Sequence, residues 1–160
     1  MLTKGFDAPE VEAALVRAQT LCEQLGKTPD HLPILTAFWS FSFIRGELAT
    51  ARQVAERILR LAQRTPDLAW RGVAHANMQI TLYFQGELTS ARQHGEQAMA
   101  QFAIAPSVPL FLIHNFHPSV RSQVITASIL YLLGYLDQAR LQGQDALGSR
   151  ESRNHLKGSR

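Results

Sequence analysis

Apolar residues recur at helical spacing along most of the chain, and a glycine or proline interrupts them at intervals. Leu15, Ala18, Leu21 and Leu25, for example, lie on one face of a helix that stops at Gly26. Apolar residues three or four apart mark the buried face of an amphipathic helix, and a glycine or proline commonly ends it. The pattern predicts about seven helices, over residues 8–25, 31–45, 48–64, 68–85, 88–102, 118–133 and 136–147.

One heptapeptide, Gly-x-Leu-x-x-Ala-Arg, occurs three times, each time between an apolar helix and a more polar one. The copies cover residues 46–52, 86–92 and 134–140. Glycine lets the chain leave the first helix in a left-handed conformation that other residues resist. A helix–turn–helix unit that returns after 40 and then 48 residues is typical of stacked helical hairpins.

Small residues stand at matching places in the second helix of each hairpin. Two of these helices carry a glycine there, Gly95 and Gly143. A glycine inside a helix costs about 1 kcal/mol relative to alanine, so its repetition predicts close contact with a neighbouring helix. Counted from the turn glycine, the three columns are Ala51, Ala91 and Ala139; Ala55, Gly95 and Gly143; and Ile58, Ala98 and Ala146.

These positions resemble the tetratricopeptide repeat, which has a turn glycine, an apolar residue two places later, and alanines five and twelve places later. The resemblance implies an all-α fold, a right-handed superhelix of stacked antiparallel hairpins. Ile58 departs from it, and the spacing exceeds the usual 34 residues. The matching residues are Gly46, Leu48 and Ala51; Gly86, Leu88, Ala91 and Ala98; and Gly134, Leu136, Ala139 and Ala146.

Three segments resemble the helical-repeat region of large bacterial signalling proteins that also carry an adenylate/guanylate cyclase domain and an AAA-type ATPase domain. They are residues 8–12, 59–64 and 132–139. The resemblance implies a fragment of a longer array, with possible self-association through its uncapped ends. The family's catalytic motifs do not occur in this sequence, so neither enzymatic activity nor a cofactor is expected.

The net charge of +3 comes from the end of the chain. Residues 150–160 hold four basic residues and one acidic residue, and residues 1–149 sum to zero. The sequence therefore predicts a helical domain over 1–149 and a basic, disordered tail over 150–160. Binding of nucleic acid is not expected, because it requires clustered lysine and arginine.

Cysteine content and hydropathy favour a cytoplasmic protein without a membrane span. Cys22 is the single cysteine, so no internal disulfide forms. The longest uncharged apolar run, residues 122–136, falls short of the roughly 20 residues that a spanning helix needs. The first residues lack the apolar core of a signal peptide.

The first helices of stacked hairpins line a concave face, which is the candidate binding groove. Its aromatic and apolar residues suit an apolar peptide or another segment of the parent protein. The groove positions contain no lysine. Alternatively, these residues belong to the core or are covered by residues 103–117, a proline-containing apolar loop expected to lie across the helices. The groove residues are Trp39, Ser40, Phe43, Asn77, Ile80, Tyr83, Phe84, Val124, Ser128 and Tyr131.

Other candidate chemistry is weak. His114 and His117 form an H-x-x-H without a third ligand nearby in sequence, and His75 is expected to be a hydrogen-bonded structural residue. The repeated arginines Arg52, Arg92 and Arg140 are expected to be solvated and to pair with nearby acids. The sequence thus predicts a non-catalytic protein-interaction scaffold. The alternative is a small-molecule-sensing superhelical domain of a transcription regulator.

Overall fold

The computed structural model describes residues 28–105 and 117–157, together with positions 10, 13, 16, 17, 20 and 24. In these residues it contains helices and no strands, which confirms the all-α prediction. Most of the helix expected at 8–25, with Cys22, and most of the loop expected at 103–117 lie outside the described residues. The helices are α2 (Thr28–Ile44), α3 (Leu48–Ala62), α4 (Leu68–Phe84), α5 (Leu88–Ile104), α6 (Pro118–Leu132) and α7 (Leu136–Lys157).

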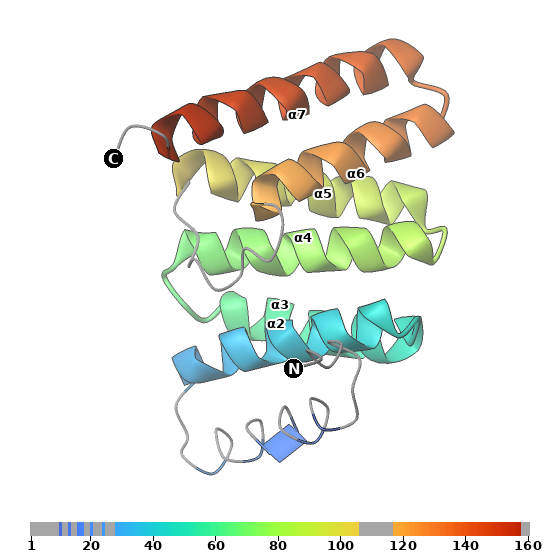
Figure 1. Ribbon diagram of the computed structural model, residues 1–160. Coiled ribbons are helices and arrows are strands. Elements are labelled where there is room, and N and C mark those ends of the chain that lie inside the picture. Colours follow the sequence, from blue (N-terminus) through green and yellow to red (C-terminus); the bar gives the residue numbers. More distant parts are fainter. Residues whose placement is uncertain are drawn as a thin grey trace, which may run out of the picture.

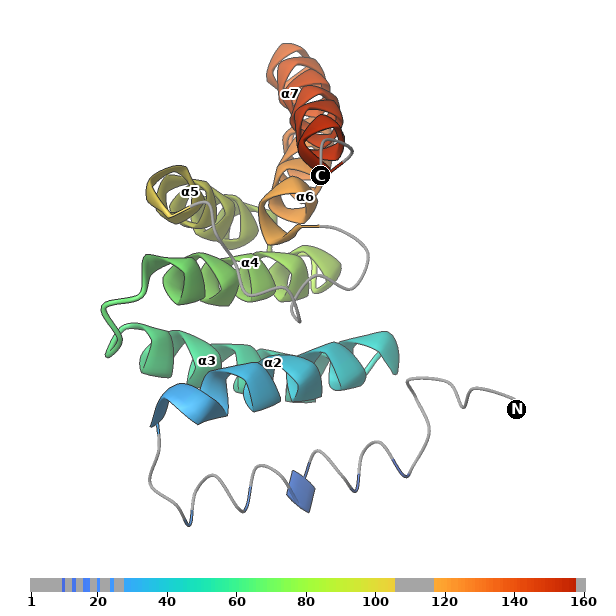
Figure 2. The same cartoon turned by 60° about the vertical axis from the view of Figure 1, so that its left-hand side comes forward.

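The helices pair into three hairpins, α2–α3, α4–α5 and α6–α7, that stack in chain order (Figure 1). Helix α4 is central, because it packs against α3, α5 and α6 and, over a smaller area, α2. The first helices of the hairpins, α2, α4 and α6, therefore touch in succession. In the rotated view, α4 lies between the α2–α3 pair below it and α6 above it (Figure 2). Within the described part, no helix is long and apolar enough to cross a membrane.

The three turn glycines have the predicted left-handed conformation. The φ angles of Gly46, Gly86 and Gly134 are 76°, 82° and 86°. At the second turn the Gly86 N–H donates to the Tyr83 carbonyl at 3.1 Å, and the Glu87 N–H donates to the Leu82 carbonyl at 2.9 Å. The same pair of hydrogen bonds closes the other two turns. This is the Schellman ending of a helix, which satisfies carbonyl groups that the helix leaves unpaired.

Replacing Gly86 with alanine should lower the free energy of unfolding by about 1 kcal/mol, because the left-handed conformation is strained for a residue with a Cβ. Space is not the cause, since a Cβ at Gly86 meets nothing within 4 Å. Gly86→Asn should cost less, because asparagine tolerates this conformation better. Urea unfolding of the two variants measures the difference, and equal stability of Gly86→Ala and wild type would contradict the argument.

In the column of Ala55, Gly95 and Gly143, only one of the two glycines lies in close contact with neighbouring helices. A Cβ on Gly95 of α5 would lie 2.4 Å from Gln79 Nε2 on α4 and 2.8 Å from Thr126 Oγ1 on α6. A Cβ on Gly143 of α7 would meet nothing within 4 Å. The prediction of close approach is therefore confirmed at Gly95 and wrong at Gly143, because no described helix packs on that face of α7.

Two helix ends differ from the sequence prediction. Helix α2 begins at Thr28 instead of residue 31 and carries Pro33 inside it. Helix α7 continues to Lys157, so the disordered tail predicted from residue 150 is wrong for 150–157. Gly148 does not end α7, because it lacks the left-handed φ of the three turn glycines, and no proline follows it. The sequence prediction therefore ended this helix ten residues too early, because it treated Gly148 as a helix end.

Candidate functional site

The ten predicted groove residues do not form one open surface. Trp39, Asn77 and Ile80 are buried at the contacts between helices, and their expected exposure in a groove is corrected. Ser40, Phe43, Tyr83 and Ser128 are partly buried. Phe84, Val124 and Tyr131 are exposed. The three buried residues take part in helix packing, and the other seven are at least partly accessible to a ligand.

An aromatic row connects α2 to the end of α4. The rings of Trp39 and Phe43 stack with centroids 5.4 Å apart, and the Phe43 ring meets the edge of Phe84 at 5.1 Å. Phe84 also meets Tyr83 edge-on at 5.1 Å. Such pairs add stability beyond the area that they bury. The row leads from the buried Trp39 to Phe84, whose side chain is 55% exposed.

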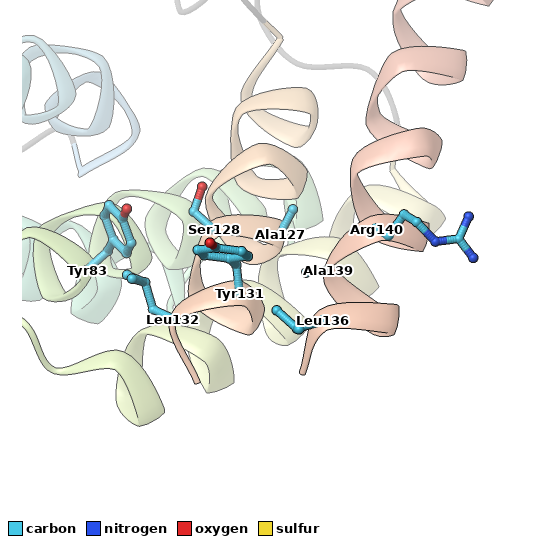
Figure 3. Close-up of a pocket in the computed structure, with 8 residues that line it drawn as sticks. All are labelled: Tyr83, Ala127, Ser128, Tyr131, Leu132, Leu136, Ala139 and Arg140. Atoms are coloured by element: carbon cyan, nitrogen blue, oxygen red, sulfur yellow. The ribbon is translucent and has the colours of Figure 1, made fainter. Parts of the chain in front are cut away.

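A hollow of about 590 Å³ lies between the end of α4, the second half of α6 and the start of α7 (Figure 3). The predicted residues Tyr83, Ser128 and Tyr131 line it, together with residues that the groove prediction did not include. Tyr131 and Leu136 remain 65% and 60% exposed, although both are large and apolar in character. In Figure 3 the Arg140 side chain extends away from the other lining residues. The full lining is Tyr83, Ala127, Ser128, Tyr131, Leu132, Leu136, Ala139 and Arg140.

A polar cluster joins α2, α4 and α6 beside the buried Trp39. The indole Nε1–H of Trp39 donates to Thr81 Oγ1 at 2.9 Å, and that hydroxyl donates to the Asn77 carbonyl at 2.8 Å. Arg121 Nη2 donates to Asn77 Oδ1 at 3.3 Å. Burial lowers the pKa of Arg121 to about 10, which still leaves the guanidinium charged at neutral pH. Its Cζ lies 5.4 Å from the centre of the Trp39 ring.

A second polar cluster holds α4 against α6, and each of its polar side-chain atoms has a hydrogen-bond partner. Gln79 Nε2 donates to Thr126 Oγ1 at 2.7 Å and to the Ser122 carbonyl at 3.2 Å. Ser122 Oγ donates back to Gln79 Oε1 at 2.5 Å. Gly95 allows this cluster to sit directly against α5. A satisfied buried network of this kind fixes one packing arrangement, so we assign it a structural role.

Two histidines face each other between α4 and α5. The Nδ1 atoms of His75 and His94 are 3.0 Å apart. Burial, and secondarily the charge of His94, lowers the pKa of His75 to about 4. Burial also lowers the pKa of His94. The hydrogen bond agrees with the structural role predicted for His75.

The H-x-x-H motif is only half described. His114 lies outside the described residues, and His117 caps α6 by accepting a hydrogen bond from the Ser119 N–H at 3.3 Å. Within the described part of the chain, no three histidine, cysteine or acidic side chains gather as metal ligands would.

The repeated arginines link successive hairpins. Arg52 pairs with Glu56 on its own helix, at 3.3 Å, and with Glu87, the residue after the next turn glycine. Arg92 pairs with Glu96 at 2.9 Å, and its Cζ lies 5.3 Å from the ring centre of Tyr135, the residue after the third turn glycine. The predicted pairing of these two arginines with acids is confirmed. The equivalent Arg140 has no next turn among the described residues.

Comparison with known proteins identifies no relative. A scan against protein-family models found no matching family. Searches of the curated proteins and of the solved structures found no significant match either.

Proposed function

We propose that this chain is a helical-repeat module that binds an apolar segment of a protein and carries out no chemistry itself. The observation that carries the proposal is the hollow of about 590 Å³ between α4, α6 and α7. Its rim contains two tyrosines and two leucines. The leucines, Leu132 and Leu136, are each more than half exposed. Aromatic and aliphatic anchors of this kind dominate the energy of peptide binding. The occupant we propose is an amphipathic helix, whose apolar face fits a groove between helices.

The stacking of the hairpins supports a more specific assignment. We propose a right-handed, tetratricopeptide-like superhelix of about seven helices that belongs to a longer array. A Cβ at Gly143 of α7 meets nothing within 4 Å, whereas the equivalent Gly95 of α5 lies against side chains of α4 and α6. The open space at Gly143 fits a further helix packed on α7.

The particular protein we propose is the helical-repeat region of a bacterial signalling protein with cyclase and AAA-type ATPase domains. The resemblance of residues 8–12, 59–64 and 132–139 supports this assignment. In such a protein the amphipathic helix would come from another domain of the same chain. The module would then act by holding that domain.

Selection from a library of random peptides tests the binding proposal. Wild type should enrich peptides with apolar residues at helical spacing, and Leu132→Lys should lose them at least tenfold, because a charge then faces the apolar hollow. Ile104→Lys is the matched control, since Ile104 is 70% exposed on α5 and does not line the hollow. Equal enrichment on wild type and Leu132→Lys, or none on wild type, would refute the proposal.

A further inference from the structure

Arg121 is a partly buried cation without a carboxylate partner among the described residues. It lies in the first turn of α6, and none of the ion pairs between described residues involves it. It is the only charged residue between Glu96 and Asp137 in the sequence. The Nε atom of its guanidinium is enclosed and has no hydrogen-bond partner. A neutral amide oxygen and the face of Trp39 compensate a buried charge only in part.

Asn77 supplies a second unpaired donor at the same place. Its side chain is fully buried, and its Oδ1 accepts the hydrogen bond from Arg121 Nη2. Its Nδ2 has no acceptor. Most buried polar groups in proteins are paired, and each exception calls for an explanation. Two donors with free N–H groups, on side chains joined by one hydrogen bond, match the two oxygens of a single acceptor group.

We propose that Arg121 and Asn77, beside the ring of Trp39, form a binding site for a small oxyanion, either a carboxylate or a phosphate group. Such a group accepts hydrogen bonds from both free donors and neutralises the guanidinium, and charge-assisted bonds of this kind are strong. The position of Arg121 at the N-terminus of α6 adds the positive end of the helix dipole.

The surroundings limit access to the site. The two free donor atoms have no contact with solvent, so an anion reaches them only if the side chains around them move apart. Arg121 as a whole is only partly buried, which leaves an approach from solvent. The site is separate from the hollow, because none of its three residues lines it. It gives the small-molecule-sensing alternative a defined ligand class, independent of peptide binding.

Fluorescence of Trp39 tests the site directly. The chain has two tryptophans, so a Trp70→Phe background leaves Trp39 as the single reporter. Titration with sodium acetate and, separately, sodium phosphate, at constant ionic strength set by chloride, should give a saturable change with at least one of them. A response to acetate alone assigns a carboxylate ligand, and a response to phosphate alone assigns a phosphate ligand. The melting temperature should rise by about 5 °C at a hundredfold excess over Kd.

Two variants connect that response to the proposed residues. Asn77→Asp places a carboxylate beside Arg121, so it should abolish the response and raise the melting temperature of the free protein. Arg121→Met removes the charge and should also abolish the response. Arg60→Met, an exposed position on α3 that belongs to neither proposed site, is the control and should respond like the parent. No saturable response to either anion in the Trp70→Phe protein, or a response retained in folded Asn77→Asp, would overturn the proposal.

Discussion

Replacing Gly95 with alanine should lower the free energy of unfolding by about 2–3 kcal/mol, although alanine is the better helix former. A Cβ at this position overlaps Gln79 Nε2 and approaches Thr126 Oγ1 too closely. The neighbours must shift, which breaks hydrogen bonds of the Gln79 cluster in addition to the usual overpacking penalty of about 1–3 kcal/mol. The gain in helix propensity, about 1 kcal/mol, offsets only part of this.

Gly143 provides the matched control, because it occupies the same register in α7 with open space around it. Gly143→Ala should raise the free energy of unfolding by about 0.5–1 kcal/mol through helix propensity alone. Urea unfolding of both variants measures the two effects on one scale. The same sign for both would show that Gly95 is not a point of close helix approach.

Acidification from pH 6.5 to pH 4 should cost the protein about 2 kcal/mol through His75. Its pKa in the folded state, about 4, lies below the ordinary 6.5 because burial disfavours the charged imidazole, and the charge of His94 adds to this. The unfolded chain therefore binds the proton first, so the stability is complete above pH 6.5 and is lost as the pH falls through this interval. Linkage gives an upper value of about 3 kcal/mol, which the remaining solvent contact of His75 reduces.

The measurement is the difference in unfolding free energy between wild type and His75→Gln at a series of pH values. Glutamine keeps a hydrogen-bonding side chain beside His94 but does not titrate, so the variant should lose less stability between pH 6.5 and 4. His31→Gln controls for the removal of a histidine elsewhere in the fold. Parallel pH profiles for wild type and His75→Gln would exclude the pair as the cause.

The turns and the helices they join were predictable because their determinants are local. Each turn needs one glycine with a left-handed φ, and the heptapeptide marks it, so Gly46, Gly86 and Gly134 gave three correct turns. The sequence prediction ended α7 too early, because it rested on a glycine alone. Gly148 also follows a helical pattern but lacks the Leu, Ala and Arg of the heptapeptide, and the helix continues through it.

The surface was less predictable, because exposure depends on how successive hairpins cross. Trp39 and Phe84 carry the same aromatic signal in sequence, yet one is buried between helices and the other projects into solvent. Arg121 was overlooked, since an arginine near a helix start normally lies in water. One signal was available, namely that no other charged residue occurs between Glu96 and Asp137. An isolated charge in a long apolar stretch is a reason to look for burial.

Helix α4 carries part of both proposed sites, since Asn77 belongs to the oxyanion site and Tyr83 to the hollow. The two residues are less than two helical turns apart on one rigid element. If filling either site changes the position or order of α4, the two ligands become thermodynamically linked. Such linkage is reciprocal, so an anion that strengthens peptide binding would itself be held more tightly once the peptide is bound. The module would then bind two ligands cooperatively, and helix α4 would transmit the coupling between their sites.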